Sequence, residues 1–492
     1  MPDAAEQRQT DQRPGPTLPR WVNVADALAV GLLAAFAYVL AFGGGRFELG
    51  GFRVSITSPF RLLIELALVV ALRHAAYRQP SLLARATHAV SRVSERQWAV
   101  LAVFVGTRLL VLLVGYVAVV GIGYPKDAPQ WRTSVDEFWN LPARWDAGWY
   151  LGIALDGYAW NPADSGQQNL AFFPAVPLLM RGAAWVVWRD AEDPSKMVWA
   201  GTLVALVAVF AGFAYFFSLA RDCIGEEAGI AALTLLASYP FAVFYSASYT
   251  ESLFLLTVVA AFSHFRRSQL GRAACWGLLA GLARPNGCLL SVPLAILAVP
   301  GIDRLLGGAS SSPSQEAMPI AGSVGWRRVL LRLMAASTPG VGMLIFSAYV
   351  FWLTGHPLTW IQAAASWGRD FGGLSMIRDD LSSLRTLGVF GFVTAKPIVA
   401  LNAMGALFGL LTIWPVTRRL GLAFGVFVLL NIMLPVTSGG LVSIGRYSSV
   451  LFPSFIWLGA TTPPPLRPAL IALFAMGQGL VAVLFFTWRA LY

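Results

Sequence analysis

Residues 97–120 read QWAVLAVFVGTRLLVLLVGYVAVV, and Arg108 is the single charged residue in this run. As a helix, 24 residues rise about 36 Å, which exceeds the roughly 30 Å of a bilayer's hydrocarbon core. The apolar residues are continuous and do not alternate with polar ones, so the run is unlike a strand of a membrane barrel. It predicts a transmembrane helix.

The rest of the chain repeats this pattern. Of its 492 residues 57% are hydrophobic and only 12% are charged, about half the charged share of a soluble domain. The mean hydropathy is +0.64. We therefore predict an all-α polytopic membrane protein with about 11–13 transmembrane helices. The further apolar runs lie at about 23–43, 59–72, 171–188, 197–220, 228–246, 251–265, 273–299, 329–353, 387–415, 420–437, 447–460 and 469–488.

The loop charges predict the orientation. Residues 73–96 contain five Arg and one Glu, and such basic loops face the cytoplasm. The helix at 97–120 then leads outward, so loop 121–170, with six acidic and three basic residues, lies outside. The basic segment HFRRSQLGR at 264–272 marks another inner loop, which puts YTES at 249–252 outside, on the same side as loop 121–170.

Counting spans leaves one segment open. If 171–188 and 197–220 each crossed the membrane once, the YTES segment would fall in the cytoplasm. Either 171–196 crosses twice with short helices, or 171–188 dips into the membrane and returns.

The domain organisation follows from these runs. The polar, Pro- and Gln-rich start of the chain indicates a disordered cytoplasmic tail, and the Ser/Pro-rich stretch after residue 300 a cytoplasmic linker. The expected segments are the tail (1–22), a two-span hairpin with a basic loop (23–96), a catalytic core (97–300), the linker (301–328) and C-terminal helices (329–492).

The net charge of +11 fits basic loops against anionic lipid, and it does not indicate nucleic acid, because no soluble segment combines a basic run with aromatics. The three Cys and four His have no metal-type spacing, so we expect no metal site. No sequence feature indicates a protein partner.

The outer loop contains RWDAGWYLGIALDGY at 144–158. Read as a helix, it places Trp145, Trp149 and Tyr150 on an aromatic side, as in a helix that lies in the membrane interface.

Asp146 lies near the start of this helix, where the helix dipole favours a carboxylate. It is either a capping acid paired with Arg144 or a functional group. Asp146 and Asp156 are not a glycosidase-type pair, because ten residues of helix separate them by about 15 Å.

Two further segments combine charge with apolar surroundings. Glu251 follows Tyr249 in FYSASYTESLF, and a carboxylate at membrane depth is either paired, functional or merely a flank of the next helix. In GLARPNG, Pro285 interrupts the run 273–299, which should form two short helices meeting at the outer face. Arg284 there either grips a phosphate or extends to lipid headgroups.

Weaker signals complete the candidates. Arg446, followed by Tyr447, is at the expected outer end of a span, with a structural role equally open. Arg108 and Lys396 lie within apolar runs, where each either binds a lipid phosphate or pairs with an acid such as Glu65.

The motifs RWDAGWYLGIALDGY, LAFFPAVPLL, FYSASYTESLF and GLARPNG, in this order, resemble the PIG-V family of mannosyltransferases and its bacterial relatives. The resemblance covers roughly residues 140–290. It implies a fold of the GT-C type, a polyprenyl-phosphate sugar donor, a lipid or glycan acceptor, no cofactor, and a multi-pass cell membrane protein whose active site faces the extracytoplasmic side.

The resemblance also implies roles for residues. An essential acid in the first large outer loop corresponds to Asp146, which would act as the base of an inverting displacement. The expected substrate-binding residues are Arg144, Trp145, Trp149, Tyr150, Tyr249, Glu251, Arg284, Asn286 and Arg446. The alternative is a transporter or flippase of polyprenyl-linked glycans, which the lack of an internal repeat disfavours.

Overall fold

A computed structural model describes residues 19–42, 45–49, 52–56, 58–78, 80–85, 95–299, 301–302, 325–369 and 371–491. Contacts divide the chain into two units, Met1–Glu95 and Arg96–Tyr492, which we describe separately. Most of the expected tail and linker lies outside the described residues. The expected domain boundaries stay predictions.

The first unit is a helical hairpin. Helices α2 (Arg20–Phe42) and α3 (Pro59–Ala76) pack against each other. Between them, strands β1 (Gly45–Leu49) and β2 (Phe52–Ile56) pair antiparallel. These strands were not expected from the sequence, because their short Phe- and Val-containing segments flank a Gly pair in an otherwise helical pattern.

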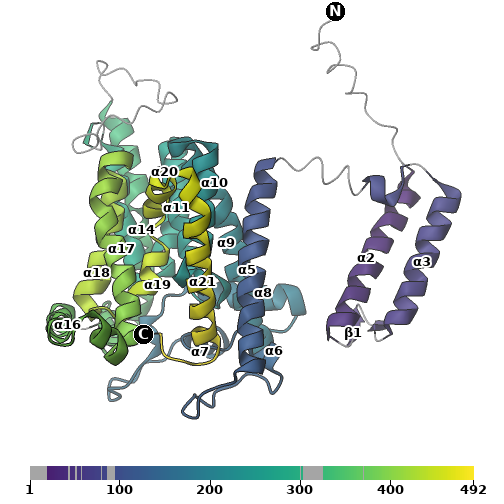
Figure 1. Ribbon diagram of the computed structural model, residues 1–492, viewed down its shortest axis with the longest axis horizontal. Coiled ribbons are helices and arrows are strands. Elements are labelled where there is room, and N and C mark those ends of the chain that lie inside the picture. Colours follow the sequence, from purple (N-terminus) through teal and green to yellow (C-terminus); the bar gives the residue numbers. More distant parts are fainter. Residues whose placement is uncertain are drawn as a thin grey trace, which may run out of the picture. The chain divides into compact units, whose positions relative to one another are not determined.

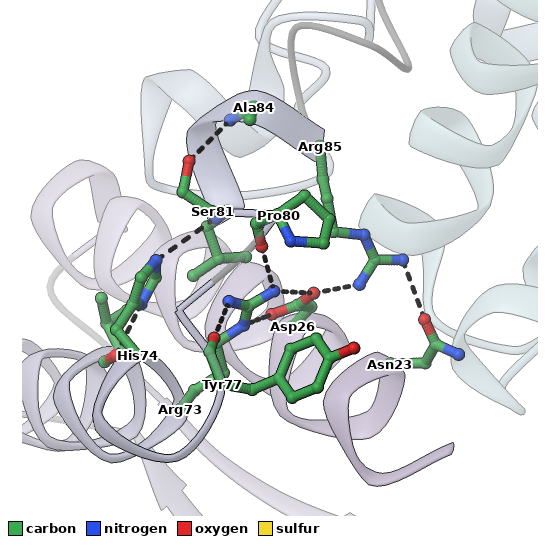
Figure 2. A network of polar contacts seen from close by, with 11 residues as sticks. Asn23, Asp26, Arg73, His74, Tyr77, Pro80, Ser81, Ala84 and Arg85 are labelled. Carbon is green, nitrogen blue, oxygen red and sulfur yellow. Dashed lines mark hydrogen bonds and ion pairs between the residues drawn. The ribbon is translucent and has the colours of Figure 1, made fainter. Parts of the chain in front are cut away.

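Buried charges hold the open end of this hairpin (Figure 2). Asp26 of α2 accepts from Arg73 of α3, with Arg73 Nε 2.7 Å from Asp26 Oδ1, and it also pairs with Arg85. The remaining guanidinium donors of Arg73 reach the carbonyls of Tyr77 and Pro80 at 2.7 and 2.8 Å. Charge and hydrogen bonds are therefore satisfied inside the hairpin.

The second unit is a helical bundle (Figure 1). Seven helices of the described chain are long and apolar enough to span a membrane. Six are α2 of the first unit and α5 (Glu95–Gly121), α9 (Pro194–Ile224), α14 (Trp326–Thr354), α17 (Pro397–Leu420) and α18 (Leu422–Gly439). The seventh joins η5 (Pro464–Leu466) to α21 (Arg467–Phe486). Over the described residues the protein is thus an all-helical multi-pass membrane protein apart from the paired strands β1 and β2. The count of 11–13 spans stays a prediction.

Shorter elements complete the bundle. They are α6 (Glu137–Asn140), α7 (Ala147–Asp156), η1 (Asn169–Ala171), α8 (Ala175–Trp188), α10 (Glu226–Ser238), η2 (Pro240–Ser246), α11 (Glu251–Arg266), α12 (Leu270–Ala283), η3 (Pro285–Leu290), α13 (Ser291–Ala298), α15 (Thr359–Ala365), α16 (Gly373–Ala395), α19 (Ile444–Ser449) and α20 (Phe452–Thr461). Helices α6 and α7 lie at one end of the bundle (Figure 1).

Helix α8 does not cross the membrane twice, which was one of the two readings of 171–196. It is a single helix of 14 residues, about 21 Å long and too short for a span. The start of α9 contacts the loop that follows α5, because Ser195 Oγ donates to the Thr133 carbonyl at 2.6 Å. The loop after α5 and the start of α9 therefore lie at the same end of the bundle, which agrees with the interpretation that 171–188 does not span the membrane.

Two long apolar runs are broken in the structure. Run 273–299 divides into α12, η3 and α13 as expected, and a Cβ at Gly287 would lie 1.9 Å from the Ala280 carbonyl oxygen, so only glycine fits there. Run 387–415 was expected to be continuous, but it divides at Lys396 between α16 and α17. Pro397 at the first position of α17 explains the break, because it lacks a backbone N–H.

Helix α11 lies in the centre of the bundle. Every residue from Glu251 to Phe265 is buried, between α9 and α12, its main packing partners. Its first residue, Glu251, is consequently a carboxylate inside the protein, which needs compensation.

Candidate active site

Asp146 is not the capping acid that one reading expected. It precedes α7 with αR backbone angles, and its side chain accepts no capping hydrogen bond. Its Oδ2 lies 2.6 Å from Nη1 of Arg446, 300 residues further along the chain. The expected pairing with Arg144 is wrong, because the guanidinium of Arg144 points elsewhere. Asp146 is 14% exposed at its side chain, so it can still meet a ligand.

Arg446 bridges two acids. Its Nη1 binds Asp146, and its Nε lies 3.2 Å from Oε1 of Glu251. Burial acts to lower the pKa of Arg446, but Glu251 and Asp146 together hold it well above its usual value. The bridge joins the start of α7, the start of α11 and the short helix α19.

Glu251 is fully buried and also pairs with Arg284, whose Nη1 lies 3.0 Å from Glu251 Oε1. Arg284 is buried too, so it does not extend to headgroups. Glu251 Oε2 has no hydrogen-bond partner within the described part of the chain. A buried carboxylate oxygen without a donor is costly unless a ligand or water satisfies it.

Arg369, in the loop after α15, is the site residue that the sequence analysis missed. Three guanidiniums surround the ring of Tyr447. Its centroid lies 4.6 Å from Arg284 Cζ, 5.3 Å from Arg369 Cζ and 5.8 Å from Arg446 Cζ. Two nitrogens of Arg369 donate to the carbonyls of Pro435 and Val442.

These residues form an uneven cluster of charge. Among the described residues, the three guanidiniums of Arg284, Arg369 and Arg446 face the two carboxylates of Asp146 and Glu251, which leaves one formal positive charge. Although burial would raise the pKa of Tyr447, Arg369, Arg284 and Arg446 lower it to about 8. The cluster therefore favours an anion.

Two arginines named from the sequence have structural contacts. Arg144 donates to the carbonyls of Phe486, Asn140 and Ala143 and to the Tyr124 hydroxyl. Burial lowers the pKa of Arg144 to about 10, so it stays charged at neutral pH. Arg108 donates to the carbonyls of Ala237 and Ala242 and braces the bend between α10 and η2.

The other expected residues lie in two places. Tyr249 accepts a hydrogen bond of 2.9 Å from the Asp146 amide, and burial, with Glu251 and Asp146 nearby, raises the pKa of Tyr150. Both tyrosines thus adjoin the charged cluster. Trp145 and Trp149 line a groove beside α7.

Two further polar residues named from the sequence contact other side chains. Asn286 Nδ2 donates to Asn431 Oδ1 at 2.8 Å, which ties η3 to α18. Lys396 pairs with Asp380 at 2.9 Å within the second unit, and Glu65 pairs with Arg61 within the first. Among the described residues no three His, Cys, Asp or Glu side chains gather as they would to hold a metal ion.

Residues 131–299 match the family model described as Mannosyltransferase (PIG-V). The resemblance to this family is confirmed over that segment. It contains Asp146, Glu251 and Arg284, while Arg369 and Arg446 lie beyond it. A comparison with curated proteins found no match.

Among solved structures the chain is similar to the oligosaccharyltransferase of Archaeoglobus fulgidus. The complex with zinc and sulfate shares 13% identity at a TM-score of 0.38, covering 78% of this chain and 53% of that one. The complex with an inhibitory peptide and a dolichol-phosphate shares 13% identity at a TM-score of 0.35, covering 78% of this chain and 56% of that one. The chain spans about half the length of these proteins, and likenesses at such TM-scores carry no functional argument.

Proposed function

We propose that the protein is a membrane glycosyltransferase that moves a sugar, mannose by its family resemblance, from a polyprenyl-phosphate donor to a lipid or glycan acceptor. The observation that carries this proposal is Asp146, a partly exposed carboxylate held by Arg446 beside a buried cluster with an excess positive charge. The family match over 131–299 supports sugar transfer.

The reaction needs one base and one anion site. The acceptor hydroxyl gives its proton to Asp146 while its oxygen attacks the anomeric carbon of the donor. The bond from that carbon to the phosphate oxygen breaks, and its electrons leave with the phosphate. A single displacement inverts the anomeric centre, so a β-linked donor yields an α-glycoside.

The guanidiniums of Arg284, Arg369 and Arg446 are placed to bind the phosphate. They surround Tyr447 within 6 Å of its ring centroid, and guanidiniums bind phosphate oxygens through charge-assisted hydrogen bonds. Stabilising the charge that develops on the leaving phosphate lowers the barrier.

Sugar transfer by purified protein with polyprenyl-phosphate mannose tests the proposal. Asp146→Asn keeps the shape of the side chain but removes the base, and we expect transfer to fall by about 10²- to 10⁴-fold. Asp127→Asn makes the same change at an exposed acid of the same loop, and it should transfer normally. Equal rates for the two variants would remove Asp146 from the mechanism.

The side of the membrane needs its own measurement. In a cysteine-free background, we expect Asp127→Cys to react with a membrane-impermeant maleimide in intact cells. Arg272→Cys, exposed in the basic segment after α11, should react only after lysis. The opposite pattern would place the site in the cytoplasm.

A further inference from the structure

A groove of about 760 Å³ lies against the face of α7 that does not bear Asp146. We propose that it is a binding site for neutral saccharide, where the sugars of the acceptor next to the reacting one are held. Only the identification of the bound sugars as the acceptor rests on the proposed function; the saccharide site itself does not. Five tryptophans line it: Trp131, Trp145, Trp149, Trp160 and Trp488.

The lining chemistry matches a sugar. Five indoles offer flat apolar faces on which the C–H side of a pyranose ring can stack, while the carboxylates of Asp156 and Asp164 can accept from hydroxyls. The volume is in the range of small-molecule sites.

The groove is unsuited to the donor phosphate. Its lining, over the described part of the chain, contains two carboxylates and no Lys or Arg, so it repels an anion. The arginine cluster around Tyr447 has the opposite charge. The donor phosphate and the acceptor sugars thus have separate binding sites, the phosphate beside Arg284 and the acceptor sugars along α7.

Helix α7 lies between the charged cluster and the groove, with one face toward each. Asp146 and Tyr150 face the charged cluster, whereas Trp145, Trp149 and Gly152 face the groove. Trp145, which lines the groove, directly precedes Asp146 in the chain, so a glycan held in the groove would lie beside the start of the helix. Gly152 borders the open space of the groove, since a Cβ there would meet nothing within 4 Å.

Two of the indoles are held on strained backbone. Trp145 and Trp488 have φ values of 51° and 59°, in the left-handed region that costs roughly 1–2 kcal/mol for a non-glycine residue. Their rings lie 4.9 Å apart, and Trp145 Nε1 donates to the Phe485 carbonyl at 3.1 Å. Strain at an aromatic pair that lines a groove is typical of a binding site.

The far wall of the groove is preorganised by its own amides. Gln168 Nε2 donates to the carbonyls of Asn161 and Asp164 at 2.9 and 2.8 Å. Asn169 Nδ2 donates to the Gly157 carbonyl at 3.1 Å. A wall fixed before binding loses little entropy when a sugar arrives.

Tryptophan fluorescence of the purified full-length protein tests the site without activity. Titration with mannose and glucose oligosaccharides should give a saturable change, and Asp146→Asn should give the same change. Gly152→Leu fills the groove, and we expect the saccharide Kd to rise about tenfold or more. Gly182→Leu is the matched control, because Gly182 of α8 is also helical with nothing within 4 Å of its Cβ.

The outcomes separate the two proposals. If Gly152→Leu weakens saccharide binding but the protein transfers no sugar from any donor, the saccharide site is supported and the proposed glycosyltransferase function is contradicted. No saturable change with the whole oligosaccharide panel, or equal binding by both leucine variants, would overturn the groove. Quenching of these tryptophans by brominated lipid in nanodiscs, with no saccharide response, would assign them to membrane anchoring and also overturn it.

Discussion

The two units each contain a cluster of buried charges, and the clusters differ in what they leave open. In the hairpin, Asp26 faces Arg73 and Arg85, and the spare guanidinium donors end on carbonyls and on Asn23 Oδ1. In the bundle, Glu251 Oε2 has no donor in the described chain, and Asp146 is partly exposed. A cluster that closes on itself holds a fold, whereas one with open acceptors can bind a ligand.

Besides the loss of Asp146 itself, the largest effect should come from Arg446→Gln. It removes the bridge between Asp146 and Glu251, so that Asp146 loses its cation and Glu251 keeps Arg284 alone. Removing one partner of a buried ion pair costs about 3–5 kcal/mol. We expect transfer to fall at least 100-fold and the melting temperature in detergent to drop, because the base loses its position and the phosphate a cation.

Two companions sharpen this test. Arg418→Gln removes an exposed arginine at the end of α17 and should change neither quantity. Combining Arg446→Gln with Asp146→Asn should restore part of the stability and none of the transfer, because both members of that ion pair are then neutral and the pair of Arg284 with Glu251 is kept. Full transfer by Arg446→Gln would make this cluster as structural as the one in the hairpin.

The members of the bundle cluster were recognisable one by one from the sequence, but their pairing was not. Asp146, Glu251, Arg284 and Arg446 each interrupt or end an apolar pattern, where a charge is expensive. No local pattern joins Asp146 to a residue 300 positions away, so Arg144, its neighbour, was the natural but wrong partner.

Arg369 shows the other limit. It lies in SWGRDFGG, a polar connection with no apolar run around it, and an arginine there is ordinarily solvated. Only the fold brings it to Tyr447. A charged residue in a short connection at the expected outer side was the available signal.

Arg369→Gln should have a smaller effect than the loss of Arg446. It removes one of three cations from the phosphate site and leaves the three ion pairs of Asp146 and Glu251 intact. We therefore expect the KM for the donor to rise about tenfold with the acceptor KM unchanged. Arg378→Gln, at an exposed position of α16, is the control. A rise in acceptor KM alone would place Arg369 at the acceptor instead.

The pH dependence of donor affinity gives a still smaller effect. With the pKa of Tyr447 lowered to about 8, its phenolate forms above that pH and cancels the excess positive charge. We expect the donor KM to rise roughly threefold between pH 7 and pH 9, and Tyr447→Phe to remove the rise. A rise that persists in Tyr447→Phe would assign it to another group.

Asp26→Asn should leave transfer unchanged and affect only the hairpin. The change leaves Arg73 buried without its carboxylate, so we expect faster hydrogen exchange and proteolysis in α2 and α3. Glu65→Gln breaks an exposed pair with Arg61 in the same hairpin, and such surface pairs contribute little, so its exchange should match wild type. If Asp26→Asn abolished transfer while the hairpin kept its protection, the closed cluster would have a functional role, and open acceptors would no longer distinguish the two regions.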